Sequence, residues 1–156
     1  FATLIHPKGI ILCYPASRAD SIGQSVTQNI DLQNVISNTT QQLSVHPFIK
    51  ACLTALFGHY PVTDEEYKSV NSLTKINENT PPTFVWQTFN DEIINGSETI
   101  AYVNELYRHH IPVEFHLFDK GIHGISLATE DVTKHSDEHV AHWSELAIEW
   151  IHRNQL

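Results

Sequence analysis

The chain has 156 residues, the length of a single domain, and 41% of them are hydrophobic against 17% charged. It can therefore bury a core and is not an intrinsically disordered chain. Nine Lys and Arg residues against 18 Asp and Glu residues give a net charge of −9 with neutral histidines. That charge repels phosphate backbones and anionic lipids, which argues against nucleic acid and membrane partners.

The start of the chain and its cysteines bear on what kind of polypeptide this is. The sequence begins with Phe1 and contains no Met, so we expect a piece of a longer polypeptide. Cys13 and Cys52 are too few for a disulfide framework and are expected to be small, buried side chains. Few cysteines and no secretory pattern favour a cytoplasmic location.

Three short segments are predicted to be strands. Residues 9–14 form a continuous apolar run that Pro15 closes, as expected of a strand covered on both faces. Residues 83–88 are aromatic and β-branched, and residues 113–118 follow Pro112 with a similar composition. These strands predict an α/β fold with a mostly parallel sheet.

Two helices are predicted between the first two strands. Pro47 suits the first position of a helix, and Gly58 is a typical stop signal. The spacing of Thr63 and Glu66 is that of a capping box, which predicts a second, short helix.

Longer segments define the expected organisation of one partial domain over residues 1–156. We expect residues 16 to about 45 to be a long connection or a small insertion that lies over the fold, because they are polar and weakly periodic. Residues 83–118 are predicted to be a βαβ unit, whose helix Ser97 would cap, and residues 136–153 a C-terminal helix with an apolar stripe. Three strands are half of an open sheet, so we expect an N-terminal part of the polypeptide to complete it.

An acid and a base follow two of these strands. Asp91 comes three residues after the strand that ends at Thr88, and His123 comes five residues after the strand that ends at Phe118. Reactive groups in open parallel sheets gather beyond the carboxyl ends of the strands, so the two loops are expected to meet. A buried carboxylate beside an imidazole fixes its tautomer and stabilises the imidazolium, which makes a general base.

Each residue also has an ordinary structural explanation. An Asn90–Asp91 pair after a strand is common in turns, and His123 is one of 11 histidines. Their joint placement at two strand ends favours a catalytic pair over two unrelated loop residues.

The segments around these residues resemble a known family. Residues 81–91, followed 32 positions after Asp91 by His123 within residues 118–127, are similar to the C-terminal half of the α/β-hydrolase esterases. The acetyl-xylan-esterase-like and carboxylesterase-like branch is the nearest, and the prolyl-peptidase catalytic domains are a more distant resemblance. The resemblance implies the C-terminal portion of an α/β-hydrolase fold, a mostly parallel sheet flanked by helices. Residues 46–58 are similar to the short cap region of that branch, which implies a cap-like insertion over residues 16–70.

The same resemblance implies a function. Asp91 would be the acid and His123 the base of a Ser-His-Asp triad that cleaves carboxylic esters, with short acyl chains and acetylated sugars as candidate substrates. The family order is Ser, Asp, His, so the serine would precede residue 1 on a G-x-S-x-G elbow. This elbow and the oxyanion-hole loop are both absent from the sequence, and residues 91–95 lack the Val-Pro that relatives commonly carry after the acid. The chain alone is then expected to be inactive, and the intact protein to need no metal or cofactor.

Two other functions stay open. The chain could be a hydrolase-fold module that binds a ligand or partner without catalysis, because fold does not fix function. It could also bind a metal, because residues 135–139 spell H-x-x-E-H and His142 lies one turn further on. A histidine-rich surface is the commoner explanation of that second pattern.

Overall fold

The computed structural model describes residues 7–18, 47–60 and 62–156. Most of the expected insertion over residues 16–70 therefore lies outside the described residues. In chain order the elements are β1 (Ile10–Cys13), α3 (Pro47–Phe57), α4 (Asp64–Ser69), the 3₁₀ helix η1 (Ser72–Lys75), β2 (Thr83–Thr88), α5 (Gly96–Arg108), β3 (Val113–Phe118), α6 (Glu138–Ala141) and α7 (Trp143–Arg153).

The three strands form one parallel sheet in the order β1-β2-β3. Ile10 pairs with Thr83, and Thr83 pairs with Val113, so all three strands start level with one another. β2 and β3 have the bounds that their composition predicts, and β1 is one residue shorter at each end than the apolar run of residues 9–14. The predicted βαβ unit is confirmed, and all three carboxyl ends lie at one edge of the sheet.

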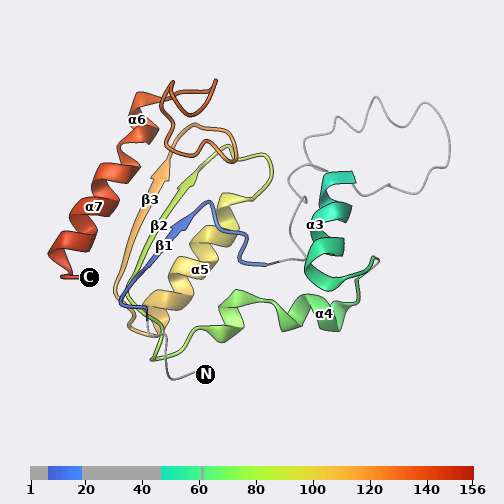
Figure 1. The fold of residues 1–156 in the computed structure, drawn as a ribbon. Coiled ribbons are helices and arrows are strands. Elements are labelled where there is room, and N and C mark those ends of the chain that lie inside the picture. Colours follow the sequence, from blue (N-terminus) through green and yellow to red (C-terminus); the bar gives the residue numbers. More distant parts are fainter. Residues whose placement is uncertain (1–6, 19–46, 61) are drawn as a thin grey trace.

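Helices cover both faces of this sheet, with α7 on one side and α5 on the other (Figure 1). Phe84 and Trp86 alternate along β2 and pack in one core with Trp150 of α7. On the opposite face, Tyr102 and Leu106 of α5 form a second core. Successive side chains of a strand point to opposite faces, so Val85, between Phe84 and Trp86, is buried on the face away from the α7 core.

Capping side chains determine the residue at which helices α4 and α5 begin. Thr63 and Glu66 form the predicted capping box of α4. The prediction that Ser97 caps α5 is wrong, because the Asn95 side chain accepts a hydrogen bond from the Ser97 N–H at 2.9 Å and α5 begins at Gly96. Asn is a stronger N-cap than most residues, and it lies two positions earlier.

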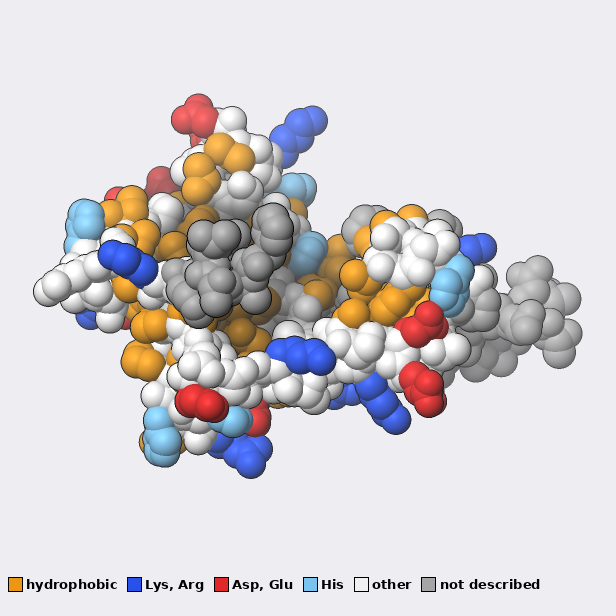
Figure 2. Space-filling view, turned by 60° about the horizontal axis from the view of Figure 1, so that its bottom comes forward, with side chains coloured by type: hydrophobic (Ala, Val, Ile, Leu, Met, Phe, Trp, Pro, Cys, Tyr) orange, Lys and Arg blue, Asp and Glu red, His pale blue; other side chains and the backbone are white. Residues whose placement is uncertain are grey.

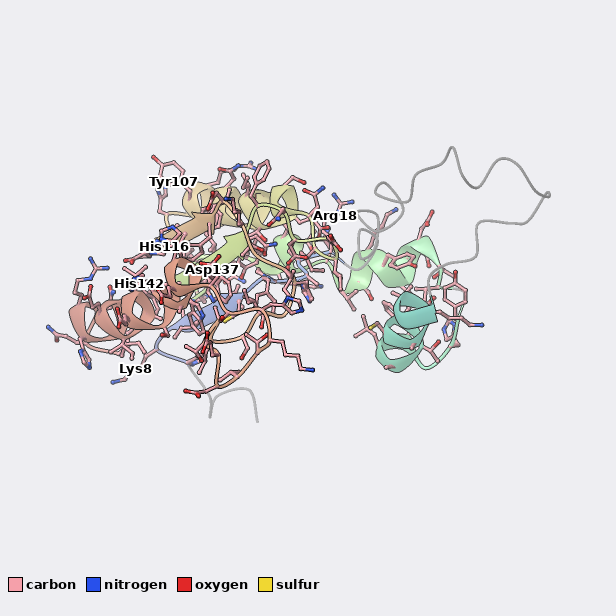
Figure 3. All side chains as sticks on the ribbon, turned by 90° about the horizontal axis from the view of Figure 1, so that it is seen from above. Lys8, Arg18, Tyr107, His116, Asp137 and His142 are labelled. Carbon is pink, nitrogen blue, oxygen red and sulfur yellow. The ribbon has the colours of Figure 1, made fainter. Side chains whose placement is uncertain are left out.

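The predicted helix over residues 136–153 is two helices in the structure. The Asp137 side chain accepts hydrogen bonds from the N–H groups of His139 and Val140, so α6 begins at Glu138. His142 separates α6 from α7 although its own φ and ψ are helical. Figure 3 labels both Asp137 and His142 on this part of the fold.

Helices α3 and α4 lie to one side of the sheet (Figure 1), around a small core in which Phe57, Tyr60 and Tyr67 pack on Leu53. Gly58 ends α3 with a φ of +80°, as its position after the helix predicts. No helix in the described part of the chain is long and apolar enough to cross a membrane.

Candidate active site

The acid of the predicted pair lies in the loop that follows β2. The Asp91 side chain is completely buried, and its Oδ1 accepts hydrogen bonds from the backbone N–H groups of Ile93 at 2.8 Å and Ile94 at 2.9 Å. An Asp side chain that binds the backbone two and three residues ahead is ordinary turn chemistry. The turn expected of this segment is therefore present, and it fixes the direction of the carboxylate.

The second oxygen of the same carboxylate joins two further elements. Asp91 Oδ2 lies 2.9 Å from His123 Nδ1, and it accepts a hydrogen bond from Gln87 Nε2 at 3.1 Å. Gln87 is fully buried, donates also to the Ile94 carbonyl at 3.1 Å and accepts from Thr99 Oγ1 at 3.4 Å. Four groups thus donate hydrogen bonds to the carboxylate of Asp91. One of them, the Gln87 side-chain amide, is in turn held by Thr99 of helix α5.

These contacts decide the charge of the acid. Burial alone would raise the pKa of Asp91, but hydrogen bonds from His123 and from the backbone of Ile94 and Ile93 outweigh it and lower the pKa below its usual value. Asp91 is therefore an ionised carboxylate at neutral pH, which accepts hydrogen bonds and donates none.

That charge also fixes the tautomer of the base. Because Asp91 can only accept, His123 Nδ1 must carry the proton of their hydrogen bond. In the neutral ring, Nε2 then has a free lone pair, and the side chain is 26% exposed. The arrangement gives a proton acceptor that reaches solvent, with a buried negative charge behind it to stabilise the protonated form.

The two loops are also joined directly. The Gly121 N–H donates to Asn90 Oδ1 at 2.8 Å, and the Gly121 carbonyl accepts from Thr88 Oγ1 at 2.9 Å. Gly121 has a φ of +140°, and a Cβ at this position would lie 2.5 Å from Thr88 Cγ2. Only glycine fits here, so the loop that carries His123 is tied to the end of β2.

The prediction that Asp91 and His123 meet above neighbouring strands is thus confirmed, whereas their catalytic roles stay a proposal. Sequence reasoning missed Gln87 and Tyr14, whose ring centroid lies 5.0 Å from that of His123. A glutamine within an aromatic and β-branched strand was the signal for Gln87. No signal in the sequence connects Tyr14 with His123, because they are 109 positions apart.

The structure does not place the H-x-x-E-H residues as the metal hypothesis requires. His135 precedes the Asp137 cap, so it does not share a helix with His139 of α6. Within residues 7–18, 47–60 and 62–156, no group of three or more His, Cys, Asp or Glu side chains could hold a metal ion.

The basic side chains are scattered on the face of the molecule that Figure 2 shows. Lys and Arg side chains lie among acidic and neutral ones there, and the described residues form no broad basic patch on this face.

Comparison with known proteins places this arrangement in a wider group. The chain is 33% identical over 76 residues to the endo-1,4-β-xylanase B of Butyrivibrio fibrisolvens, a match over 49% of this chain and 12% of that protein. A sugar hydrolase from Lactococcus lactis superposes with a TM-score of 0.68 at 28% identity, over 94% of this chain and 48% of its own length. The acetyl ester-xyloside bifunctional hydrolase of Caldicellulosiruptor lactoaceticus gives 0.65 at 24% identity, over 94% of this chain and 42% of its own.

The chain therefore spans less than half the length of each of these three proteins. Its parallel sheet with helices on both faces is part of the α/β-hydrolase fold. The model of the prolyl oligopeptidase family matches residues 35–149, which is well over half of the sequence, and the chain belongs to that family.

Proposed function

We propose that the protein is a serine hydrolase that cleaves carboxylic esters, with Asp91 as the acid and His123 as the base of its triad. The observation that carries this proposal is the 2.9 Å contact between a fully buried, ionised carboxylate and an imidazole that reaches solvent. Two loops from neighbouring strand ends supply this pair, which is where α/β folds gather reactive groups.

The reaction follows from the tautomer of His123. Its Nε2 takes the proton of the serine hydroxyl while the serine oxygen attacks the ester carbonyl, and backbone N–H groups stabilise the oxyanion. The carbon–oxygen bond to the alcohol then breaks, and Nε2 returns the proton to the leaving alcohol. Water attacks the acyl-enzyme, with its proton passing through Nε2 to the serine, and the carboxylic acid leaves. Asp91 stays ionised and stabilises the imidazolium in both steps.

The position of the nucleophilic serine is also a proposal, because the sequence contains no G-x-S-x-G motif. In α/β hydrolases the triad follows the chain order Ser, Asp, His, so we place the serine in a segment N-terminal to residue 1. This chain covers 48% of the sugar hydrolase. That share is in keeping with a further, N-terminal half of the protein that carries the serine and the oxyanion hole.

The substrate class is inferred from the two more similar proteins, a xylanase at 33% identity and a sugar hydrolase at 28%. We propose short acyl groups, such as acetyl, on sugar hydroxyls. An acetyl group is small and needs only a small acyl pocket, whereas the sugar would contact residues around the entrance of the site.

The experiment is a comparison of acetate release from acetylated xylo-oligosaccharides and from an aryl acetate by the full-length protein. His123→Ala is expected to lower kcat by about 10³-fold or more, and Asp91→Asn by a similar factor, because loss of a triad member has that effect. His142→Ala is the matched control, since the His142 side chain is exposed and its ion pair within the described part of the chain is with the exposed Glu145. A wild-type level of turnover in His123→Ala would refute the proposal, and a wild-type protein that releases no acetate would favour the binding module.

A further inference from the structure

Tyr14 lies between the end of β1 and the base of the proposed triad. Its ring centroid is 5.0 Å from that of His123 with an interplanar angle of 67°, and 5.1 Å from that of Trp86 with an angle of 86°. Both are edge-to-face contacts, the geometry that aromatic rings favour. Trp86 is fully buried and stacks on Trp143, so the wall behind Tyr14 is rigid.

The backbone of Tyr14 is held in an unusual conformation. Its φ is +40°, in the left-handed region that bulky residues avoid, and its N–H donates to the Trp86 carbonyl at 2.9 Å. Strained residues persist where the surrounding structure over-determines them, and they cluster at functional sites. This conformation carries the ring past the end of the sheet and toward His123.

Burial and then the nearby Cys13 raise the pKa of Tyr14, so its hydroxyl stays protonated at neutral pH. The backbone of Ser126, three residues after the base, acts to lower the pKa of Tyr14, and Ser126 also has a left-handed φ of +56°. The contact of Tyr14 with the base is therefore the edge-to-face packing of its ring on the His123 ring.

From these contacts we propose that Tyr14 is a positioning residue for His123. Asp91 holds the imidazole at Nδ1, and Tyr14 packs against the ring and limits its rotation about the Cα–Cβ and Cβ–Cγ bonds. Two supports from different strands fix the direction of Nε2, which a single hydrogen bond leaves free to swing. This inference rests on the proposed function, because it assigns a partner to the proposed base.

The kinetic test compares two substitutions of Tyr14 in the full-length protein. Tyr14→Asn removes the ring while Asn tolerates a left-handed φ, so the backbone is preserved; Tyr14→Phe keeps the ring and loses only the hydroxyl. Tyr14→Asn is expected to lower kcat about 10- to 100-fold with KM unchanged, because a small misplacement of a catalytic group has effects of that size. Tyr14→Phe is expected to stay within about threefold of the wild type in kcat.

Tyr107→Asn is the matched control, since Tyr107 is 76% exposed on α5 and is labelled at the periphery of the molecule in Figure 3. Its kcat is expected to equal that of the wild type. Unchanged kcat in Tyr14→Asn, or an equal loss in Tyr14→Phe and Tyr14→Asn, would overturn the role of the ring.

A second readout does not depend on turnover. In the wild-type protein, proton NMR is expected to show nuclear Overhauser effects between the ring protons of Tyr14 and His123, and in Tyr14→Asn the His123 resonances are expected to broaden or move. If the wild type hydrolyses no ester but shows these effects, the proposed function fails while the packing of Tyr14 on His123 stands. If it hydrolyses esters and lacks them, Tyr14 is not a positioning residue and the proposed function stands.

Discussion

Gly121→Ala is a perturbation whose cost can be worked out from the structure. Gly121 sits in the loop before His123 with a φ of +140°, and its two backbone groups bind Asn90 and Thr88. An added Cβ would lie 2.5 Å from Thr88 Cγ2 and 3.2 Å from Thr88 Cβ. Thr88 is almost fully buried in the sheet, so it has no room to move away.

Two effects add to the expected loss of stability. Placing a side chain at this φ costs about 1–3 kcal/mol, and forcing an extra carbon into a packed site costs about another 1–3 kcal/mol. The sum of about 2–6 kcal/mol is a large part of the roughly 5–15 kcal/mol by which a domain is stable. Part of the strain will be relieved by moving the loop, which displaces His123 from Asp91 and lowers hydrolytic turnover as well.

The free energy of unfolding is measured by urea denaturation of the wild type, Gly121→Ala and Gly124→Ala. Gly124 is the matched control, because it has a φ of +72° and a Cβ there would meet no atom within 4 Å. An alanine at this position has the backbone strain without a clash and is expected to cost about 1–2 kcal/mol, so it shows how large a loss strain alone produces. Thr88→Ser removes the clashing methyl group and keeps the hydroxyl. In a Thr88→Ser background the cost of Gly121→Ala is expected to fall by about 1 kcal/mol or more.

Equal losses of stability in Gly121→Ala and Gly124→Ala would refute this reasoning. The same is true if Thr88→Ser leaves the cost of Gly121→Ala unchanged. Either result would mean that the His123 loop is not tied to the end of β2 in the way that the contacts indicate.

Three further predictions concern the carboxylate and the helix that supports it. The pKa of Asp91 is lowered in the folded protein, so its ionised form stabilises the fold above the usual Asp pKa of about 3.9. This stabilisation is lost as the pH falls through the lowered pKa. Urea denaturation is therefore expected to find Asp91→Asn less stable than the wild type at pH 7, and the difference in free energy of unfolding to disappear at low pH. Gln87→Leu leaves buried polar partners unsatisfied, so a loss of about 1–3 kcal/mol is expected in the same assay, and no loss would contradict the network. Asn95→Ala is expected to lower the free energy of unfolding by about 1 kcal/mol and Ser97→Ala by less than about 0.5 kcal/mol, and the reverse order would contradict the assignment of the cap.

Much of the fold can be predicted from the sequence because its strands are short apolar segments with proline directly before or after them. The bounds of β2 and β3 follow from residues 83–88 and 113–118 alone. Parallel pairing follows from the length of chain between them, and with it the meeting of the loops that carry Asp91 and His123. Local pattern and chain topology are enough for these features.

Features that depend on three-dimensional packing could not be predicted in the same way. Ser97 satisfies the pattern of an N-cap, but the choice between it and Asn95 depends on which side chain reaches the first free N–H groups. The single helix expected over residues 136–153 overlooked the cap at Asp137, which sets the start of α6. Tyr14 lies far from His123 in sequence, so only the folded sheet brings their rings together.

The central claim is that the Asp91–His123 pair activates a serine, and labelling with a fluorophosphonate probe tests it most directly. The probe bonds covalently to a serine only when an adjacent base makes that serine nucleophilic. Wild-type full-length protein and the His142→Ala control are predicted to be labelled at neutral pH, and His123→Ala and Asp91→Asn to lose that labelling. Undiminished labelling of His123→Ala, or an unlabelled wild type that is folded, would contradict the claim.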